Sequence, residues 1–89
     1  MTDPVWIEER DALALHDCLL ALHGGPAGVR NTALLHSALA RPRQISAYAQ
    51  TPGIIDMAAA YTAGIVRNRP CVDGNKRTGF VVGVLFLEL

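Results

Sequence analysis

Apolar residues recur with the period of an α-helix along most of this chain. In residues 8–23, EERDALALHDCLLALH, leucines and alanines fall between polar positions, and acidic residues occupy the first turns. That spacing gives the helix one apolar face, and acids near its N-terminus interact favourably with the helix dipole. The Gly-Gly-Pro sequence at 24–26 then ends the helix. The pattern therefore predicts an amphipathic helix over residues 8–23.

A second helix is expected through TALLHSALAR, residues 32–41. Asn31 or Thr32 can serve as its N-cap, since a side-chain oxygen at that position accepts a backbone N–H that is otherwise unpaired. Pro42 should close the helix, because proline lacks the N–H that the next helical hydrogen bond needs.

Two largely apolar helices follow a weakly patterned stretch, residues 42–53, that ends in a turn signal at Pro52-Gly53. Residues 54–68, IIDMAAAYTAGIVRN, contain alanines and a glycine that permit close approach, so this helix should be buried and central. Pro70 stops it, because the residue before a proline avoids helical geometry. Residues 75–89 form the last helix. Their valines would also suit a strand, but the length of the segment and the cap signal before it favour a helix.

The expected helices make a small all-α bundle, with residues 1–89 as a single domain. Hydrophobic residues make up 51% of the chain and aromatic ones only 6%, so Leu, Ala, Val and Ile must fill the core. The chain stops at Leu89, inside the last expected helix and without a Gly, Asn or Pro cap. Either that helix frays at its end or the chain is short there.

Composition indicates a soluble, cytoplasmic protein. The longest apolar run, residues 79–87, is about half as long as a membrane crossing requires. The opening MTDPVWIEER lacks the basic and apolar regions of a signal peptide. Cys18 and Cys71 have neither metal-binding nor redox spacing, so two reduced thiols are expected, with a disulfide between them as the alternative.

The stretch RNRPCVDGNKRTGF, residues 67–80, holds four of the chain's eight basic residues and joins the last two helices. A helix start exposes unpaired N–H groups and about half a positive charge, so it attracts anions. Gly74 lets the backbone approach a ligand closely. Lys76 and Arg77 fall in the first turn, where the dipole disfavours cations, and an anionic ligand would remove that cost. The stretch is therefore a candidate anion site, and a helix start that is merely capped by Asp73 is the alternative.

Asp73 has two candidate roles at this helix start. As an N-cap, its carboxylate would accept from the N–H of Asn75 or Lys76. As a hard oxygen ligand, it would hold Mg²⁺ against a phosphate. The sequence leaves both open. A P-loop is excluded, because no G-x-x-x-x-G-K-[ST] motif occurs.

The same stretch resembles the signature loop of the Fic/Doc superfamily, in particular that of the death-on-curing (Doc) toxins. The family pattern runs His-x-Phe-x-(Asp/Asn)-(Gly/Ala)-Asn-Lys-Arg-Thr, and the Asp-Gly-Asn-Lys-Arg-Thr core at 73–78 matches it. The likeness extends to LH at 15–16, HGGPAGVRNTALLHSALARP at 23–42, the small-residue helix at 57–66 and LFLEL at 85–89. It implies a Fic/Doc-like helical bundle, here short of the family's C-terminal helices.

Within the superfamily, the loop resembles the Doc branch. Fic adenylyltransferases have Gly-Asn-Gly-Arg with a further arginine three residues on, and Lys76 and Phe80 replace the second glycine and that arginine here. The resemblance implies a toxin of a type II toxin–antitoxin pair, which transfers phosphate from Mg-ATP to a hydroxyl of translation elongation factor Tu. It also implies a cognate antitoxin as partner.

The family's residue roles carry over to the matching positions. By resemblance, Asp73 would hold Mg²⁺, and Asn75 would position either phosphate oxygens or the loop. Lys76 and Arg77 would neutralise phosphate charge, and the backbone N–H groups of residues 74–77, beginning with Gly74, would form the anion hole.

Two positions depart from the family pattern. Arg69 stands where the family has its catalytic His, and a guanidinium cannot accept a proton at physiological pH. Cys71 replaces the larger Phe that packs the loop on the core. Loss of a general base usually slows a reaction by about 10²- to 10⁴-fold, so we expect an intact anion site with impaired transfer. Three explanations stay open: a naturally degenerate toxin, a variant selected because the active toxin kills its host, or a chemistry that tolerates Arg69.

A catalytically dead pseudoenzyme that binds nucleotide or antitoxin is the alternative function. Direct nucleic-acid binding is disfavoured because the basic patch is short and has no interleaved aromatics; its residues are Arg67, Arg69, Lys76 and Arg77. The histidines at 16, 23 and 36 are expected to be ordinary partly buried or surface residues, because metal-binding pairs on a helix are spaced three or four apart.

Overall fold

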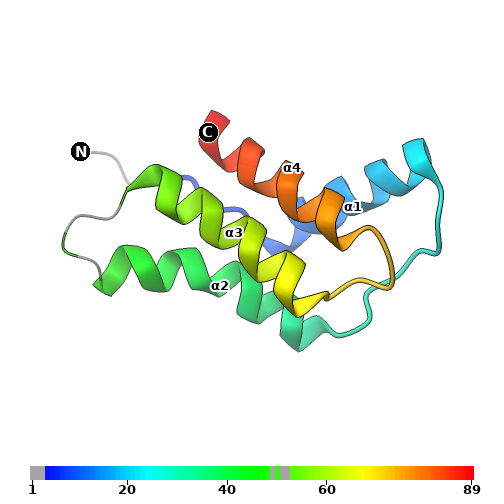
Figure 1. The fold of residues 1–89 in the computed structure, drawn as a ribbon, viewed down its shortest axis with the longest axis horizontal. Coiled ribbons are helices and arrows are strands. Elements are labelled where there is room, and N and C mark those ends of the chain that lie inside the picture. Colours follow the sequence, from blue (N-terminus) through cyan, green and yellow to red (C-terminus); the bar gives the residue numbers. More distant parts are fainter. Residues whose placement is uncertain (1–3, 49, 51–52) are drawn as a thin grey trace.

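Four helices make up the computed structural model, which describes residues 4–48, 50 and 53–89 (Figure 1). They are α1 (Glu9–His23), α2 (Thr32–Tyr48), α3 (Ile54–Asn68) and α4 (Asn75–Glu88). The all-α prediction is confirmed, and α1, α3 and α4 begin and end within a residue of the expected bounds. Within the described part of the chain, no helix is both long and apolar enough to cross a membrane.

The course of α2 shows that the prediction for Pro42 was wrong. The helix does not close there but continues through Pro42 to Tyr48. A proline inside a helix forgoes one hydrogen bond and crowds the carbonyl four residues earlier. Pro42 is among the fully buried side chains, so its packing in the core offsets that cost. Pro52, of the expected Pro-Gly turn, lies outside the described residues.

Side chains cap the first two helices. In α1 the backbone N–H of Glu8 donates to the carboxylate of Asp11 at 3.0 Å, as part of a reciprocal capping box. In α2 the N–H of Leu34 donates to the side-chain oxygen of Asn31 at 3.1 Å. Of the two expected caps for α2, Asn31 is therefore the one that is used.

The central position predicted for the third helix is confirmed, since α3 packs against both α2 and α4 (Figure 1). Small residues bring these helices close together. A Cβ built on Gly64 of α3 would lie 3.2 Å from the Cα of Ala38 in α2. On the other side, the hydroxyl of Thr62 donates to the carbonyl of Gly79 in α4 at 2.8 Å. A larger side chain at either glycine would push the helices apart.

Tyr61 of α3 lies at the centre of the core and is fully buried. Its ring packs against Phe86 of α4 at 5.1 Å between centroids, and Trp6 stacks on Phe86 at 6.0 Å. The buried hydroxyl of Tyr61 accepts the backbone N–H of Ile7 at 2.9 Å, so burial leaves this polar atom satisfied. These contacts tie the segment before α1 to the two most apolar helices.

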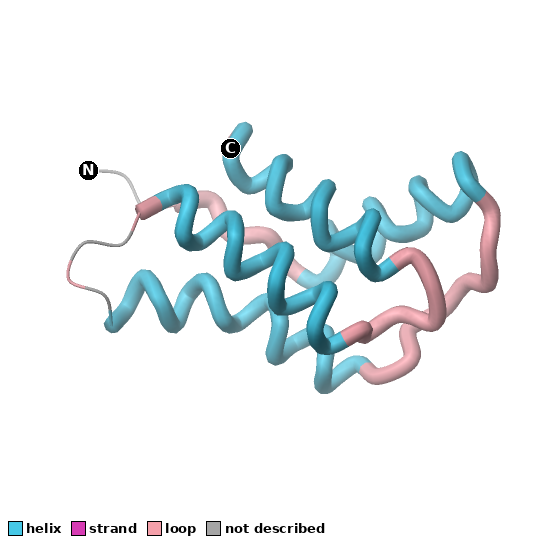
Figure 2. Tube along the Cα trace, viewed as in Figure 1, coloured by secondary structure: helices cyan, strands magenta, loops and turns pink. Residues whose placement is uncertain are grey.

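Two connections run side by side at one end of the bundle (Figure 2). The α1–α2 loop comprises residues 24–31, and the α3–α4 loop comprises residues 69–74. An isolated antiparallel bridge joins Val29 of the first loop to Cys71 of the second. The sequence stretch that predicted an anion site therefore rests on a loop from the other half of the chain.

Candidate functional site

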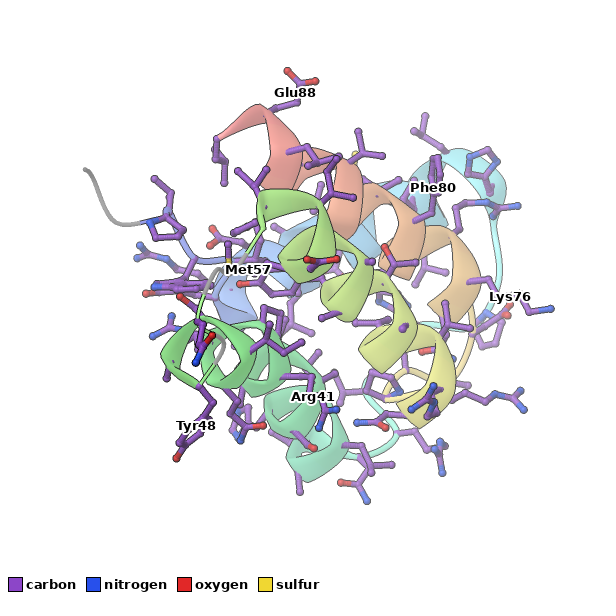
Figure 3. All side chains as sticks on the ribbon, turned by 60° about the vertical axis from the view of Figure 1, so that its left-hand side comes forward. Arg41, Tyr48, Met57, Lys76, Phe80 and Glu88 are labelled. Carbon is purple, nitrogen blue, oxygen red and sulfur yellow. The ribbon has the colours of Figure 1, made fainter. Side chains whose placement is uncertain are left out.

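A groove with a volume of about 910 Å³ opens where α1, the end of α3 and the start of α4 meet. Its walls come from three sequence segments that the two adjacent loops bring together. The lining residues are His23, Gly24, Gly25, Val66, Arg69, Val72, Asp73, Gly74, Asn75, Lys76, Arg77 and Phe80. All six residues expected to bind or act on an anion, Arg69 and Asp73 to Arg77, are among them. Figure 3 places the labelled Lys76 and Phe80 on the same side of the molecule.

The start of α4 presents unpaired backbone donors to this groove. The first backbone hydrogen bond of the helix runs from the N–H of Thr78 to the carbonyl of Gly74 at 2.9 Å, so the N–H groups of residues 75–77 have no partner within the helix. Gly74 occupies the N-cap position with φ 75° and ψ 18°, and no side chain caps the helix. The positive φ explains why this position suits glycine.

Asp73 does not cap α4, which corrects one of its two expected roles. Because Gly74 begins the helix, Asp73 lies one residue too early for an N-cap. Its carboxylate accepts the N–H of Gly74 at 2.8 Å rather than that of Asn75 or Lys76. The other carboxylate oxygen lies against the α1–α2 loop, where a Cβ on Gly25 would come within 2.7 Å of it. Gly25 thus leaves room for the carboxylate at the groove wall.

Three exposed cations surround the helix start. Arg69, Lys76 and Arg77 are exposed, and none of them forms an ion pair among residues 4–48, 50 and 53–89. Lys76 and Arg77 lie in the first turn of α4, where the helix dipole disfavours them. Uncapped N–H groups and unpaired cations therefore concentrate positive potential in one groove, and such an arrangement suits a phosphate-bearing ligand.

Arg69 holds an unusual backbone conformation at the end of α3. It is the C-cap of that helix, with φ 49° and ψ 57°, and is the one non-glycine residue with positive φ in the described part of the chain. Glycine is the usual residue at such a cap. The carbonyl oxygens of Asn68 and Arg69 accept hydrogen bonds from the guanidinium of Arg30 at 3.0 and 2.9 Å. The side chain of Arg30 thus stabilises the conformation from the α1–α2 loop.

The side chain of Asn75 holds the α3–α4 loop in place by hydrogen bonds to Cys71. Its side chain is buried, with an exposed fraction of 8%. The side-chain oxygen accepts the N–H of Cys71 and the side-chain nitrogen donates to the Cys71 carbonyl, both at 2.9 Å. Of the two roles carried over for Asn75, the structure therefore shows the positioning of the loop.

Cys71 packs into the protein rather than facing the groove. It is 3% exposed, and burial, together with the negative charge of Asp17, raises the pKa of its thiol above the ordinary value. A raised pKa means a smaller thiolate fraction, so Cys71 is a packing residue rather than a reactive thiol. Cys18 is exposed, and neither cysteine is in a disulfide.

A single carboxylate is available to a metal in the groove. No cluster of three or more His, Cys, Asp or Glu side chains is present in the described residues. Mg²⁺ commonly uses one or two protein carboxylates and completes its coordination with phosphate oxygens and water. The exposed carboxylate of Asp73, beside the unpaired N–H groups and cations of the helix start, fits that donor set.

Three contributors to the site were missed by sequence reasoning. His16 of α1 is buried, with its Nε2 2.8 Å from the carbonyl oxygen of Asp73. Arg30 binds the end of α3, and His23 lines the groove from the end of α1. His36, by contrast, is exposed and bonds Glu9 at 2.9 Å, as expected of a surface histidine. The stretches noted for their resemblance, LH at 15–16 and residues 23–42, contain these three residues, but gave none of them a role in the site.

Comparison with known proteins agrees with this geometry. A sequence model described as the Fic/DOC family matches residues 6–87. The chain belongs to the Fic/Doc family. The match includes α1, α2, α3, all but the last residue of α4, and the whole groove, so the signature stretch lies in the fold that the family pattern implied.

Two relatives connect the chain to the death-on-curing branch of the Fic/Doc family. "Toxin Doc" of Mycolicibacterium smegmatis is 40% identical over 70 residues, which cover 74% of this chain and 52% of the relative. "Protein kinase doc" of Escherichia phage P1 is 27% identical over 82 residues, covering 92% of this chain and 65% of the relative. The chain thus spans between half and two thirds of the length of these relatives.

Proposed function

We propose that the groove is a Doc-type phosphoryl-transfer site, which binds Mg-ATP and in which transfer to a protein hydroxyl is impaired. The observation that carries this proposal is the joint placement of unpaired N–H groups, three unpaired cations and one carboxylate around the start of α4. Phosphoryl transfer depends mainly on positioning and on cations that offset phosphate charge, and these are the groups the groove offers.

Each side chain has a role in this proposal. Lys76 and Arg77 offset the charge of the phosphates, while the N–H groups at the helix start donate to phosphate oxygens. Asp73 would hold Mg²⁺, which neutralises phosphate charge when it is bound. Asn75 acts indirectly, by holding the loop through Cys71.

The impairment follows from Arg69. In the transfer step, a base takes the proton of the acceptor hydroxyl as its oxygen bonds to the γ-phosphorus, and the bond from that phosphorus to the bridging oxygen of ADP breaks. By resemblance, Arg69 stands where the family has its base, and its guanidinium stays protonated. Arg69 also adds a fixed positive charge, which would strengthen anion binding while leaving the hydroxyl proton without an acceptor.

Restoring a histidine at position 69 tests whether the protein is a phosphotransferase. The test compares the parent, Arg69→His and Arg69→Gln with γ-labelled ATP and translation elongation factor Tu, the target implied by resemblance. Arg69→His should raise label transfer by about 10²-fold or more over both other proteins. Arg69→Gln controls for loss of the charge, and every variant keeps a Cβ at the strained backbone position. Equal transfer by all three would refute the phosphotransferase reading.

The alternative is a pseudoenzyme that binds nucleotide or an antitoxin without transfer. Arg69 favours it, because this residue keeps the positive charge of the groove and removes the base. In that case Mg-ATP would bind to the parent while Arg69→His restored no transfer. The type II pairing, a cognate antitoxin and a cytoplasmic location belong to the same proposal, and they draw their support from the toxin named among the relatives.

A further inference from the structure

The imidazole of His16 packs against the start of α4 on its buried side. His16 is 2% exposed, and it reaches the signature loop from a helix 57 residues earlier in the sequence. A Cβ built on Gly74 would lie 3.8 Å from both Nε2 and Cδ2 of this imidazole, and 3.9 Å from the side chain of Leu20. The ring of His16 therefore packs directly against Gly74, the N-cap of α4.

The hydrogen bond to Asp73 defines the protonation of the ring at Nε2. The carbonyl oxygen of Asp73 can only accept, so the Nε2 of His16, at 2.8 Å, must be the donor. The nearest acidic group to the other nitrogen, Nδ1, is the exposed carboxylate of Asp17 at 4.0 Å. Both the neutral Nε2–H form and the imidazolium keep the donor that Asp73 uses.

This bond orients the peptide unit between Asp73 and Gly74. A trans peptide is planar, and its C=O and N–H point in opposite directions. The C=O of Asp73 points into the core, toward the buried His16, so the N–H of Gly74 points to the exposed side. There it donates to the carboxylate of Asp73 at 2.8 Å. The donor next to the helix start thus faces the groove because the acceptor of the same peptide is held in the core.

We propose that His16 is a positioning residue of the anion site: its Nε2–H holds the Asp73 carbonyl, which fixes the Gly74 N–H on the Asp73 carboxylate and thereby directs the unpaired N–H groups of residues 75–77 at a phosphate oxygen. The proposal rests on the proposed function, since it assumes that the groove binds a phosphate. It differs from ordinary core packing in one respect. A packing role requires the volume of the imidazole, whereas a positioning role requires a donor at Nε2.

Substitutions separate the donor from the volume. In His16→Gln the side-chain nitrogen can reach about the same place as Nε2, so the hydrogen bond to Asp73 can be kept. In His16→Asn the nitrogen is one bond closer to the backbone and falls short, although the residue stays polar. His16→Leu removes the donor and keeps an apolar side chain. His36→Gln is the matched control, because His36 is exposed on α2 and bonds Glu9, away from the groove.

Two measurements are made on each folded variant. The first is the amide resonance of Gly74 in a ¹H–¹⁵N spectrum without ligand, together with its hydrogen exchange. The second is the affinity for Mg-ATP by calorimetry, at a temperature where urea unfolding shows the variant to be native. We expect His16→Asn and His16→Leu to move the Gly74 resonance and to weaken Mg-ATP binding by about ten-fold, the equivalent of one hydrogen bond. His16→Gln and His36→Gln should stay within about three-fold of the parent.

Each outcome of these measurements either supports or overturns the positioning role of His16. If His16→Asn leaves both the Gly74 resonance and the affinity unchanged, the positioning role is overturned and His16 is a core residue. The same conclusion holds if His16→Gln is as impaired as His16→Asn. Should His16→Leu fail to fold, the Gln and Asn pair still decides. If the parent binds no Mg-ATP, the proposed function fails, while the Gly74 resonance still shows whether His16 sets that peptide.

Discussion

The side chain of Asn75 bonds both backbone polar groups of Cys71, at 2.9 Å each. This pair closes the α3–α4 loop onto the first residue of α4, so the end of the loop and the start of the helix form one unit. The unpaired N–H groups that precede Thr78 begin at Asn75, within this unit. The amide of Asn75 therefore links the stability of the fold to the geometry of the anion site.

Replacing Asn75 should consequently be costly to the fold. In Asn75→Ala the N–H and C=O of Cys71 lose their partners in a buried environment, and we expect a loss of about 2–3 kcal/mol in unfolding free energy. Asn68→Ala is the matched control. It removes a single bond, from the Asn68 side chain to the Leu34 carbonyl, and should lose about 1 kcal/mol. Urea unfolding measures both, and equal losses would show that the paired bonds add nothing.

Lys76→Gln should change stability and binding in opposite directions. Removing a cation from the first turn of α4 relieves its repulsion with the dipole, so the ligand-free protein should gain a few tenths of a kcal/mol. The same change should weaken Mg-ATP binding by about ten-fold, and the difference should shrink at high salt because the charge is exposed.

Arg41→Gln provides the control for charge, because Arg41 is exposed on α2 and does not line the groove. It should leave Mg-ATP affinity within about two-fold of the parent at any salt concentration. Calorimetry at low and high salt compares the two variants. A Lys76→Gln protein that binds like Arg41→Gln would contradict the role of Lys76 in the groove.

Thr78 of α4 and Thr62 of α3 allow a matched pair of substitutions. The Thr78 hydroxyl is buried and has no hydrogen-bond partner among the described residues. Thr78→Val should therefore raise the unfolding free energy by about 1 kcal/mol, because a methyl replaces an unsatisfied polar group of similar size. The Thr62 hydroxyl donates to the Gly79 carbonyl, so Thr62→Val should lower it by about as much. Thermal or urea unfolding that gave both changes the same sign would contradict the assignment.

The sequence pattern predicted the elements better than it predicted their contacts. The helix at 54–68 follows from its apolar composition and from Pro70, and the one expected at 75–89 follows from its length. The groove residues from 69 to 77 follow from one contiguous stretch. The continuation of α2 past Pro42 was missed, because its cost is offset by burial against other helices, which no local rule registers.

Sequence reasoning missed His16 and Arg30 for the same reason. His16 binds a backbone carbonyl of the α3–α4 loop from 57 residues away, and Arg30 binds carbonyls at the end of α3 and the start of that loop from 38 and 39 residues away. Hydrogen bonds to backbone carbonyls leave no residue-type signature at the accepting position, so a sequence gives no sign of the partner. The cap predicted for Asp73 failed for a related reason. Its carbonyl is held by His16 and Gly74 takes the N-cap, so the carboxylate is left facing the groove.

The two cysteines should differ sharply in reactivity and in their response to pH. Cys18 is exposed, whereas Cys71 is buried, and burial followed by the charge of Asp17 raises the pKa of its thiol. A disulfide reagent at pH 7.5 should therefore label Cys18→Ser, which retains Cys71, far more slowly than Cys71→Ala, which retains Cys18. Equal rates in the native proteins would show that Cys71 is not buried.

The same raised pKa sets the sign of a stability change at alkaline pH. Because folding favours the protonated thiol, the stabilisation is fully present below the ordinary pKa of 9.0 and is lost as pH rises through the higher pKa of the folded state. Tyr61, whose pKa is raised by burial from 10.0, acts in the same direction at higher pH. Unfolding free energy measured in urea should thus stay level from pH 7 to about 9 with respect to these groups and fall above it. The fall should be smaller in Cys71→Ala than in Cys18→Ser, and a Cys71→Ala protein with the full alkaline loss would assign that loss to Tyr61 alone.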